Sequence, residues 1–225
     1  MLTRTLVLLL LCALPALAQE PKLLDPNKVP REGQDPKVFV PQGWRIEDIY
    51  KGDLNKDDSL DVVIQLVEDG PETDAEGVVQ THSRALVVLL EQGGKLHRVG
   101  VSNRVLYCTT CGGALSAPGP GQVKIEKGII LVDQLRGARE IVHTILRFRY
   151  EPQDKRVLLI GQDDIQTDRN SGESKSVSIN RLTGKRITEK LQYDAKKDKD
   201  VVLSSKQDKV TVKKQYLEDV VPPEE

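Results

Sequence analysis

Apolar residues along most of this chain either alternate with polar ones or form short β-branched runs, and turn residues interrupt them repeatedly. Both patterns are typical of β-strands, in which successive side chains point to opposite faces of the sheet. Arg139–Tyr150 shows the alternation most clearly, whereas Arg84–Gln92 is strongly apolar and predicts a buried strand. The chain shows no helical period of convincing length.

The chain is therefore expected to be all-β, an antiparallel meander of about ten short strands between disordered ends. A propeller-like ring and a sandwich are both compatible with this pattern. Tyr193–Tyr216 is expected to add a marginal terminal hairpin. The expected strands are Trp44–Tyr50, Asp61–Glu68, Arg84–Gln92, Leu96–Asn103, Gln122–Glu126, Ile129–Gln134, Arg139–Tyr150, Arg156–Gln162, Ser174–Arg181 and Lys185–Gln192.

The first two expected strands are joined by a loop rich in oxygen-bearing residues, within the stretch GDLNKDDSLDVVI. Counting Asp53 as position 1, side-chain oxygens stand at positions 1, 3, 5 and 9, and a backbone carbonyl is offered at position 7. Calcium prefers six to eight oxygen ligands from a short, tightly curled segment. The loop therefore predicts a Ca²⁺ site made by Asp53, Asn55, Asp57, Ser59 and Asp61.

This loop departs from the helix–loop–helix calcium pattern at two positions. Ile64 stands where that pattern has a bidentate Glu, and Asp58 stands where it has Gly. Asp tolerates the left-handed conformation better than most residues, so the turn remains feasible. An Asx-rich turn that binds no metal is the alternative, because Asp and Asn side chains favour turns by bonding nearby backbone.

The same stretch resembles the loop of FG-GAP repeats, the integrin α-type or VCBS-type repeats that build β-propeller blades. The resemblance implies that Asp53, Asn55, Asp57 and Asp61 are side-chain ligands, although the chain has only one good copy. The wider layout, with a later Cys-Gly-Gly and a Leu-Thr-Gly-Lys turn, is similar to a group of bacterial exported proteins of unassigned role. That resemblance implies no activity.

The N-terminus reads as a signal peptide. Arg4 precedes an apolar run that is too short to span a bilayer, and an Ala-Leu-Ala site follows it, so cleavage is expected after Ala18. Cys12 is preceded by Leu11, which does not fit a lipidation site. Four segments are thus expected: a signal peptide (1–18), an extended leader or linker (19–40), the β domain (41–193), and a charged hairpin and tail (194–225).

Export to the periplasm or the extracellular space follows from this leader, with no membrane span left after its cleavage. Cleavage would leave 32 Lys and Arg against 34 Asp and Glu, a net charge of −2. This balance argues against a nucleic-acid partner, because nucleic-acid-binding domains usually carry a basic excess. An unidentified protein or polysaccharide remains the expected partner.

Cys108 and Cys111 are the two cysteines that follow the leader. One C-x-x-C cannot complete a four-ligand zinc site, and an oxidising compartment favours a local disulfide. The alternative is a redox-active pair, which normally begins a helix within a βαβ unit. Here the preceding Leu96–Leu106 reads as strand, which favours the structural disulfide.

Two further polar groups are compatible with binding. Gln162–Glu173 carries alternating oxygen-bearing residues, although its Asn-Ser-Gly end favours a solvated hairpin loop. Arg136, Arg139, Arg147 and Arg149 surround one expected hairpin and are compatible either with an anionic partner or with a solvated strand face.

Catalytic motifs are absent: the chain has no G-x-S-x-G, no phosphate-binding Gly loop and no H-E-x-x-H. A hydrolase would rest only on scattered carboxylates. We therefore expect an exported, calcium-stabilised, non-enzymatic β domain that acts in binding or envelope structure. An exported thiol–disulfide protein using Cys108 and Cys111 is the alternative.

Overall fold

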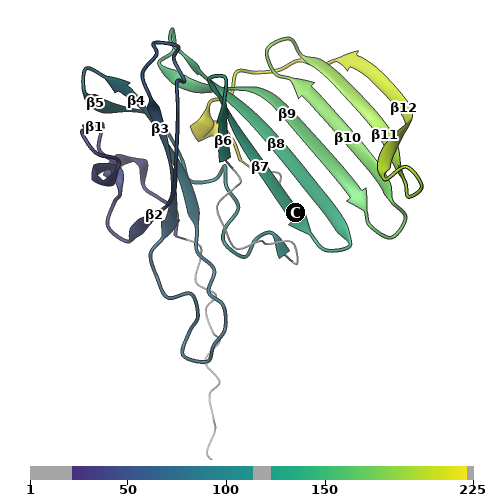
Figure 1. Ribbon diagram of the computed structural model, residues 1–225, viewed down its shortest axis with the longest axis horizontal. Helices are drawn as coiled ribbons and strands as arrows, with labels where there is room; N and C mark the ends of the chain where they lie inside the picture. Colours follow the sequence, from purple (N-terminus) through teal and green to yellow (C-terminus); the bar gives the residue numbers. More distant parts are fainter. Residues whose placement is uncertain (1–21, 114–122, 222–225) are drawn as a thin grey trace, which may run out of the picture.

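The computed structural model describes residues 22–113 and 123–221, which form two antiparallel sheets (Figure 1). The first sheet has the strand order β1-β5-β4-β3-β2, and the second has the order β12-β11-β10-β9-β8-β7-β6. The strands are β1 (Glu32–Gly33), β2 (Trp44–Gly52), β3 (Asp61–Glu68), β4 (Arg84–Gln92), β5 (Lys95–Ser102), β6 (Val123–Glu126), β7 (Ile129–Gly137), β8 (Glu140–Glu151), β9 (Arg156–Asp168), β10 (Glu173–Asn180), β11 (Lys185–Asp194) and β12 (Lys199–Lys209).

The predicted all-β antiparallel meander is confirmed. Neither sheet closes on itself, and their arrangement is consistent with a sandwich. The ends of two expected elements differ. β9 continues through Asp168, so much of the expected polar loop is strand, and β12 is a full edge strand paired with β11 along most of its length.

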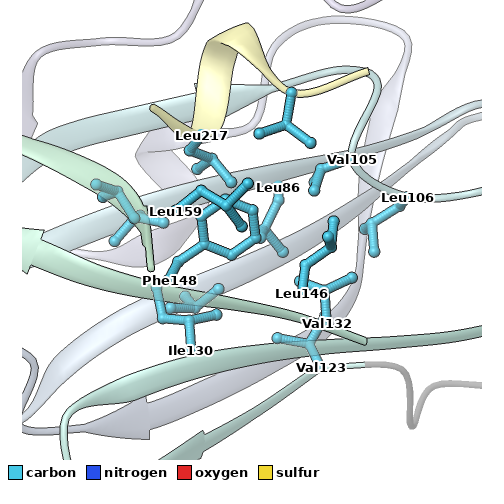
Figure 2. Close-up of a cluster of buried hydrophobic side chains, with 14 of the residues drawn as sticks. Leu86, Val105, Leu106, Val123, Ile130, Val132, Leu146, Phe148, Leu159 and Leu217 are labelled. Carbon is cyan, nitrogen blue, oxygen red and sulfur yellow. The ribbon is translucent and has the colours of Figure 1, made fainter. Parts of the chain in front are cut away.

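The core between the two sheets is built from alternate residues of both (Figure 2). Val63, Leu86 and Val88 come from the first sheet, and Leu146 and Phe148 come from β8 in the second. Figure 2 shows the labelled side chains converging, with Leu217 entering from η4 (Leu217–Asp219). Fully burying one such side chain contributes about 1.5–3 kcal/mol, so this layer is a major source of stability.

The opposite face of the first sheet is covered by the segment expected to be an extended leader. Residues 22–40 instead form β1 and two 3₁₀ turns, η1 (Pro26–Lys28) and η2 (Pro36–Phe39). Leu24, Val29 and Phe39 from this segment are buried against the sheet. The composition of residues 22–40, rich in Pro and charge, suggested a linker. Its few large apolar residues instead cover the face of the first sheet that points away from the second sheet.

The C-terminal segment closes one end of the sandwich. Leu217 and Val220 are buried in the core between the sheets. Arg156 stacks on the ring of Tyr216 at 3.6 Å from its centroid and pairs with Glu218 and Asp219. The expected signal peptide (1–18) and the expected disordered end lie outside the described residues, apart from Val221.

Phe39→Ala tests whether residues 22–40 belong to the fold. It is expected to lower the free energy of unfolding by about 3–5 kcal/mol, since Phe39 is fully buried. Val38→Ala is the matched control at the neighbouring position, where the side chain is 49 % exposed, and should change stability by less than about 0.5 kcal/mol. Urea unfolding of both variants is the measurement. Equal, small effects would mean that the segment does not contribute to the core.

Candidate functional site

The expected calcium loop is the hairpin connection between β2 and β3, closed by the pair Gly52 and Asp61. It lies against the second sheet. A Cβ at Gly52 would come within 2.6 Å of a methyl carbon of Ile125 in β6, so only glycine allows this approach. Gly128, in the β6–β7 turn, likewise lies against the backbone of Asp53. The loop thus connects two strands of the first sheet and contacts β6 and the β6–β7 turn of the second.

Asp53 organises the tip of the loop. Its Oδ1 accepts the backbone N–H of Lys56 at 2.6 Å and of Asp57 at 3.2 Å, and its Oδ2 accepts that of Asp58 at 3.2 Å. Lys56 and Asp58 both have φ of 66°, the left-handed region that the curled path requires. Asp58 therefore takes the conformation for which calcium loops usually use glycine.

Two more of the predicted ligands join Asp53 at this tip. Asn55 accepts the N–H of Asp57 at 3.1 Å, and its amide donates to the Asp57 carboxylate at 2.7 Å. The other Asp57 oxygen accepts the N–H of Ser59 at 2.8 Å. The backbone N–H of Ser59 and the amide of Asn55 lower the pKa of Asp57. The loop tip therefore gathers carboxylate and amide oxygens held by local N–H donors.

Asp61 has a different place, at the buried base of the loop. It is 0 % exposed, and its carboxylate accepts the N–H of Leu54 at 2.7 Å and of Glu91 in β4 at 2.9 Å. Burial raises the pKa of Asp61, the two N–H donors oppose this rise, and the negative charges of Asp57 and Asp53 add to it. Asp61 and the buried Leu54 therefore anchor the loop to the first sheet and to the core.

The described residues show no group of three or more His, Cys, Asp or Glu side chains arranged to hold a metal ion. Asp53, Asn55 and Asp57 nevertheless form one hydrogen-bonded cluster at the loop tip, and Asp61 lies below them. Asp53 Oδ1 accepts two N–H groups, whereas Asp53 Oδ2 and both Asp57 oxygens accept one each and keep a second lone pair. A cation at the tip could use these lone pairs.

Cys108 and Cys111 form the predicted disulfide, with Cα atoms 5.0 Å apart. Cys111 is exposed, and its N–H donates to the Cys108 carbonyl at 3.3 Å, as in a tight turn. Two hydrogen bonds of 2.9 Å tie Thr109 to the backbone of His82, just before β4. Among the described residues, neither cysteine lies in an α-helix, the setting that a thioredoxin-type pair would need.

A buried ion pair beside this turn was not predicted from the sequence. Arg84 of β4 is 4 % exposed and donates two hydrogen bonds, of 2.7 and 2.6 Å, to the Glu47 carboxylate of β2. Its remaining nitrogen faces the carbonyl of Cys108 at 3.4 Å. Burial acts to raise the pKa of Glu47. Hydrogen bonds from Arg84 and Gln65, together with the charges of Arg84 and Arg45, outweigh this effect, and the pKa of Glu47 lies below its usual value.

Sequence reasoning missed this pair because Glu47 and Arg84 lie on strands that are not adjacent in the sheet, with β3 between them. The available signal was Arg84 at the start of the apolar strand β4, since a buried charge needs a counter-ion. Gln65 of β3 bridges the gap by donating to Glu47 at 2.7 Å.

Three of the four arginines considered as a binding patch form ion pairs with neighbouring carboxylates. Arg147 pairs with Asp163 at 2.7 Å, Arg149 pairs with Glu151 at 3.1 Å, and Arg139 pairs with Asp168 at 3.3 Å. Such pairing is typical of a solvated strand face. Within the described ranges, 22–113 and 123–221, no helix is long and apolar enough to cross a membrane.

Glu47→Gln tests the buried ion pair. It is expected to cost about 3–5 kcal/mol at neutral pH, because it leaves the buried Arg84 charge without a counter-ion. The folded-state pKa of Glu47 is lowered, so the stability it contributes is present above its unfolded pKa of about 4.3 and is lost as pH falls through the folded pKa. The stability difference between the native protein and the variant should therefore narrow on acidification below about pH 4.

Urea unfolding at a series of pH values measures this difference. Glu126→Gln, at an exposed position, is the control and should cost less than about 0.5 kcal/mol at every pH. A cost for Glu47→Gln that stays constant down to pH 3 would contradict the assignment.

Comparison with known proteins adds no assignment to these sites: no protein-family model matches the chain, and no curated protein matches it significantly.

Proposed function

We propose that this protein is an exported, calcium-stabilised, non-enzymatic β domain that acts in binding or envelope structure. The observation that carries the proposal is the loop between β2 and β3. It gathers the oxygens of Asp53, Asn55 and Asp57 at an accessible tip above a base fixed by Asp61. The resemblance of this stretch to FG-GAP loops supports the same ligand set, with the Ser59 carbonyl as a fifth oxygen.

Calcium at this loop would act on the contact between the sheets. The loop base is fixed to β4 through Asp61, and the loop backbone lies against the β6–β7 turn of the second sheet at Gly128. A bound cation would also offset the mutual repulsion of Asp53, Asp57 and Asp61. Ordering the loop would thus stabilise the junction rather than create a catalytic centre.

Export is supported by the leader sequence and by the Cys108–Cys111 disulfide, because disulfides persist mainly in oxidising compartments. A calcium site fits the same setting, since extracellular calcium modules use affinities of about 10⁻⁴–10⁻³ M. A surface formed by two open sheets also suits a binding or structural role, with an unidentified protein or polysaccharide as partner.

The calcium proposal is tested by calorimetric titration of the chelator-stripped protein, combined with thermal unfolding. Saturable binding at one site is expected, and Ca²⁺ at ten times Kd should add about 1.4 kcal/mol of stability. The double variant Asp53→Ala, Asp57→Ala should lose both the binding and the added stability. Asp61 is left intact because its carboxylate also holds the backbone of Leu54 and Glu91.

A matched control removes two other acidic residues from an exposed loop. Glu72→Ala, Glu76→Ala changes the net charge by the same amount between β3 and β4 and should bind Ca²⁺ like the native protein. If the native protein binds no Ca²⁺ up to millimolar concentration, or if both double variants respond alike, the loop is an Asx-rich turn and the proposal fails.

The alternative function, a thiol–disulfide protein, rests on the exposure of Cys111 beside a bonded Cys108. It requires that the reduced pair react readily with a model disulfide. The turn's contacts with His82 and Arg84 favour a structural role, because they fix the backbone of the segment.

Cys108→Ser, Cys111→Ser separates these roles. For a structural disulfide closing so short a loop, chain entropy predicts a loss of about 2 kcal/mol, with Ca²⁺ binding unchanged. Urea unfolding measures the loss, and titration measures the binding. Insulin reduction by the native protein in the presence of dithiothreitol, abolished in the double variant, would instead support the thiol–disulfide function.

A further inference from the structure

The second sheet extends well beyond the first, so β10, β11 and β12 stand apart from the sandwich (Figure 1). A trough with a cavity of about 610 Å³ lies on this extension, between β8 and β12. Its volume is within the range of about 300–1,000 Å³ that is typical of small-molecule sites. The trough lies on a different sheet from the calcium loop.

One end of the trough carries a row of three carboxylates. Glu140 of β8 lies directly opposite Asp168 of β9, which lies directly opposite Glu173 of β10. Directly opposed residues of antiparallel strands share a face, and like charges in such positions are destabilising. Asp168 is compensated by Arg139 at 3.3 Å, whereas Glu140 and Glu173 make no ion pair among the described residues.

The next row on the same face carries two cations. Gln166 of β9 lies opposite Lys175 of β10, and Lys175 lies opposite Lys190 of β11. This row is two residues along the strands from the acidic row, a spacing of about 7 Å. Within the part of the chain that the structure describes, neither lysine forms an ion pair. The trough thus holds two rows of like charge, opposite in sign.

Apolar side chains line the trough beside these charges. The β11–β12 pairing shifts register after Lys190, and Leu203 is the extra residue of that bulge. Leu203 is 63 % exposed and lines the trough together with Val142, which lies opposite Gln166 in the lysine row. An exposed leucine between two charged rows offers an apolar contact for a ligand whose aliphatic chain links two charged ends.

We propose that this trough binds a small aliphatic zwitterion. Its ammonium group would lie at the carboxylate row, its carboxylate between Lys175 and Lys190, and its methylene chain over Leu203. A zwitterion fits better than a simple anion or cation because each row repels the charge that the other attracts. The two rows also fix the direction in which the ligand lies.

The test uses 6-aminohexanoate, whose extended chain separates its two charges by roughly the spacing of the rows, ~7 Å. Hexanoate and hexylammonium carry one charge each on the same chain length, and glycine carries both charges too close together. NMR chemical-shift titration of the mature protein gives the Kd for each compound. The expected result is that 6-aminohexanoate binds at least ten-fold more tightly than the other three.

Two double variants locate the site. Lys175→Gln, Lys190→Gln should weaken 6-aminohexanoate binding at least ten-fold and leave hexylammonium binding as tight or tighter. Lys199→Gln, Lys209→Gln removes the same charge from β12 outside the trough and should leave the Kd unchanged. Unfolding curves of both variants should resemble that of the native protein, because all four lysines are exposed.

The proposal is overturned if the native protein shows no saturable shift with 6-aminohexanoate. It is also overturned if hexanoate or hexylammonium binds equally well, or if the two lysine variants weaken binding alike. Each of these outcomes would mean that the charges of the trough are ordinary surface charges. Calcium binding at the Asp53–Asp61 loop is measured separately, so its failure would leave this test unaffected.

Discussion

The central strands of the five-stranded sheet, β3 and β4, are buried on both faces, and the rest of the molecule is arranged to cover them. Every residue from Asp61 to Val67 in β3 and from Arg84 to Leu90 in β4 is buried. A sheet of this kind is not stable in water, because each exposed apolar side chain would forfeit about 1.5–3 kcal/mol. One cover is the inner part of the second sheet, and the other is the N-terminal segment with Leu24 and Phe39.

Burial of this sheet also explains the polar interactions inside it. The Glu47 carboxylate and the Arg84 guanidinium are withdrawn from water, so each requires the other, and Gln65 completes the network from the strand between them. Asp61 follows the same logic at the opposite end of β3, where two backbone N–H groups replace water. The loop above Asp61 therefore stands on a rigid base, which is the condition for a specific ion site at its tip.

The second sheet divides into two parts with different properties. Its strands β6 to β9 supply Ile130, Leu146 and Phe148 to the core, whereas β10 to β12 extend past the first sheet and remain largely polar. The face that is apolar beneath the first sheet continues outward as rows of opposed charges. A surface of this kind contributes little to the core.

The sequence by itself determined most of the strands, the hairpin turns, the oxygen pattern of the Asp53–Asp61 loop and the proximity of the two cysteines, because these depend on residues close together in the chain. Tertiary structure decided which strands are buried on both faces and which residues pair inside the sheet, as Glu47 and Arg84 do. It also decided that residues 22–40 pack on the outer face of the first sheet. It also decided that Glu140, Asp168 and Glu173 form one row, with Lys175 and Lys190 in the next. These features depend on strand register and sheet packing. Both bring together residues that are distant in sequence, so the local pattern of residues does not predict them.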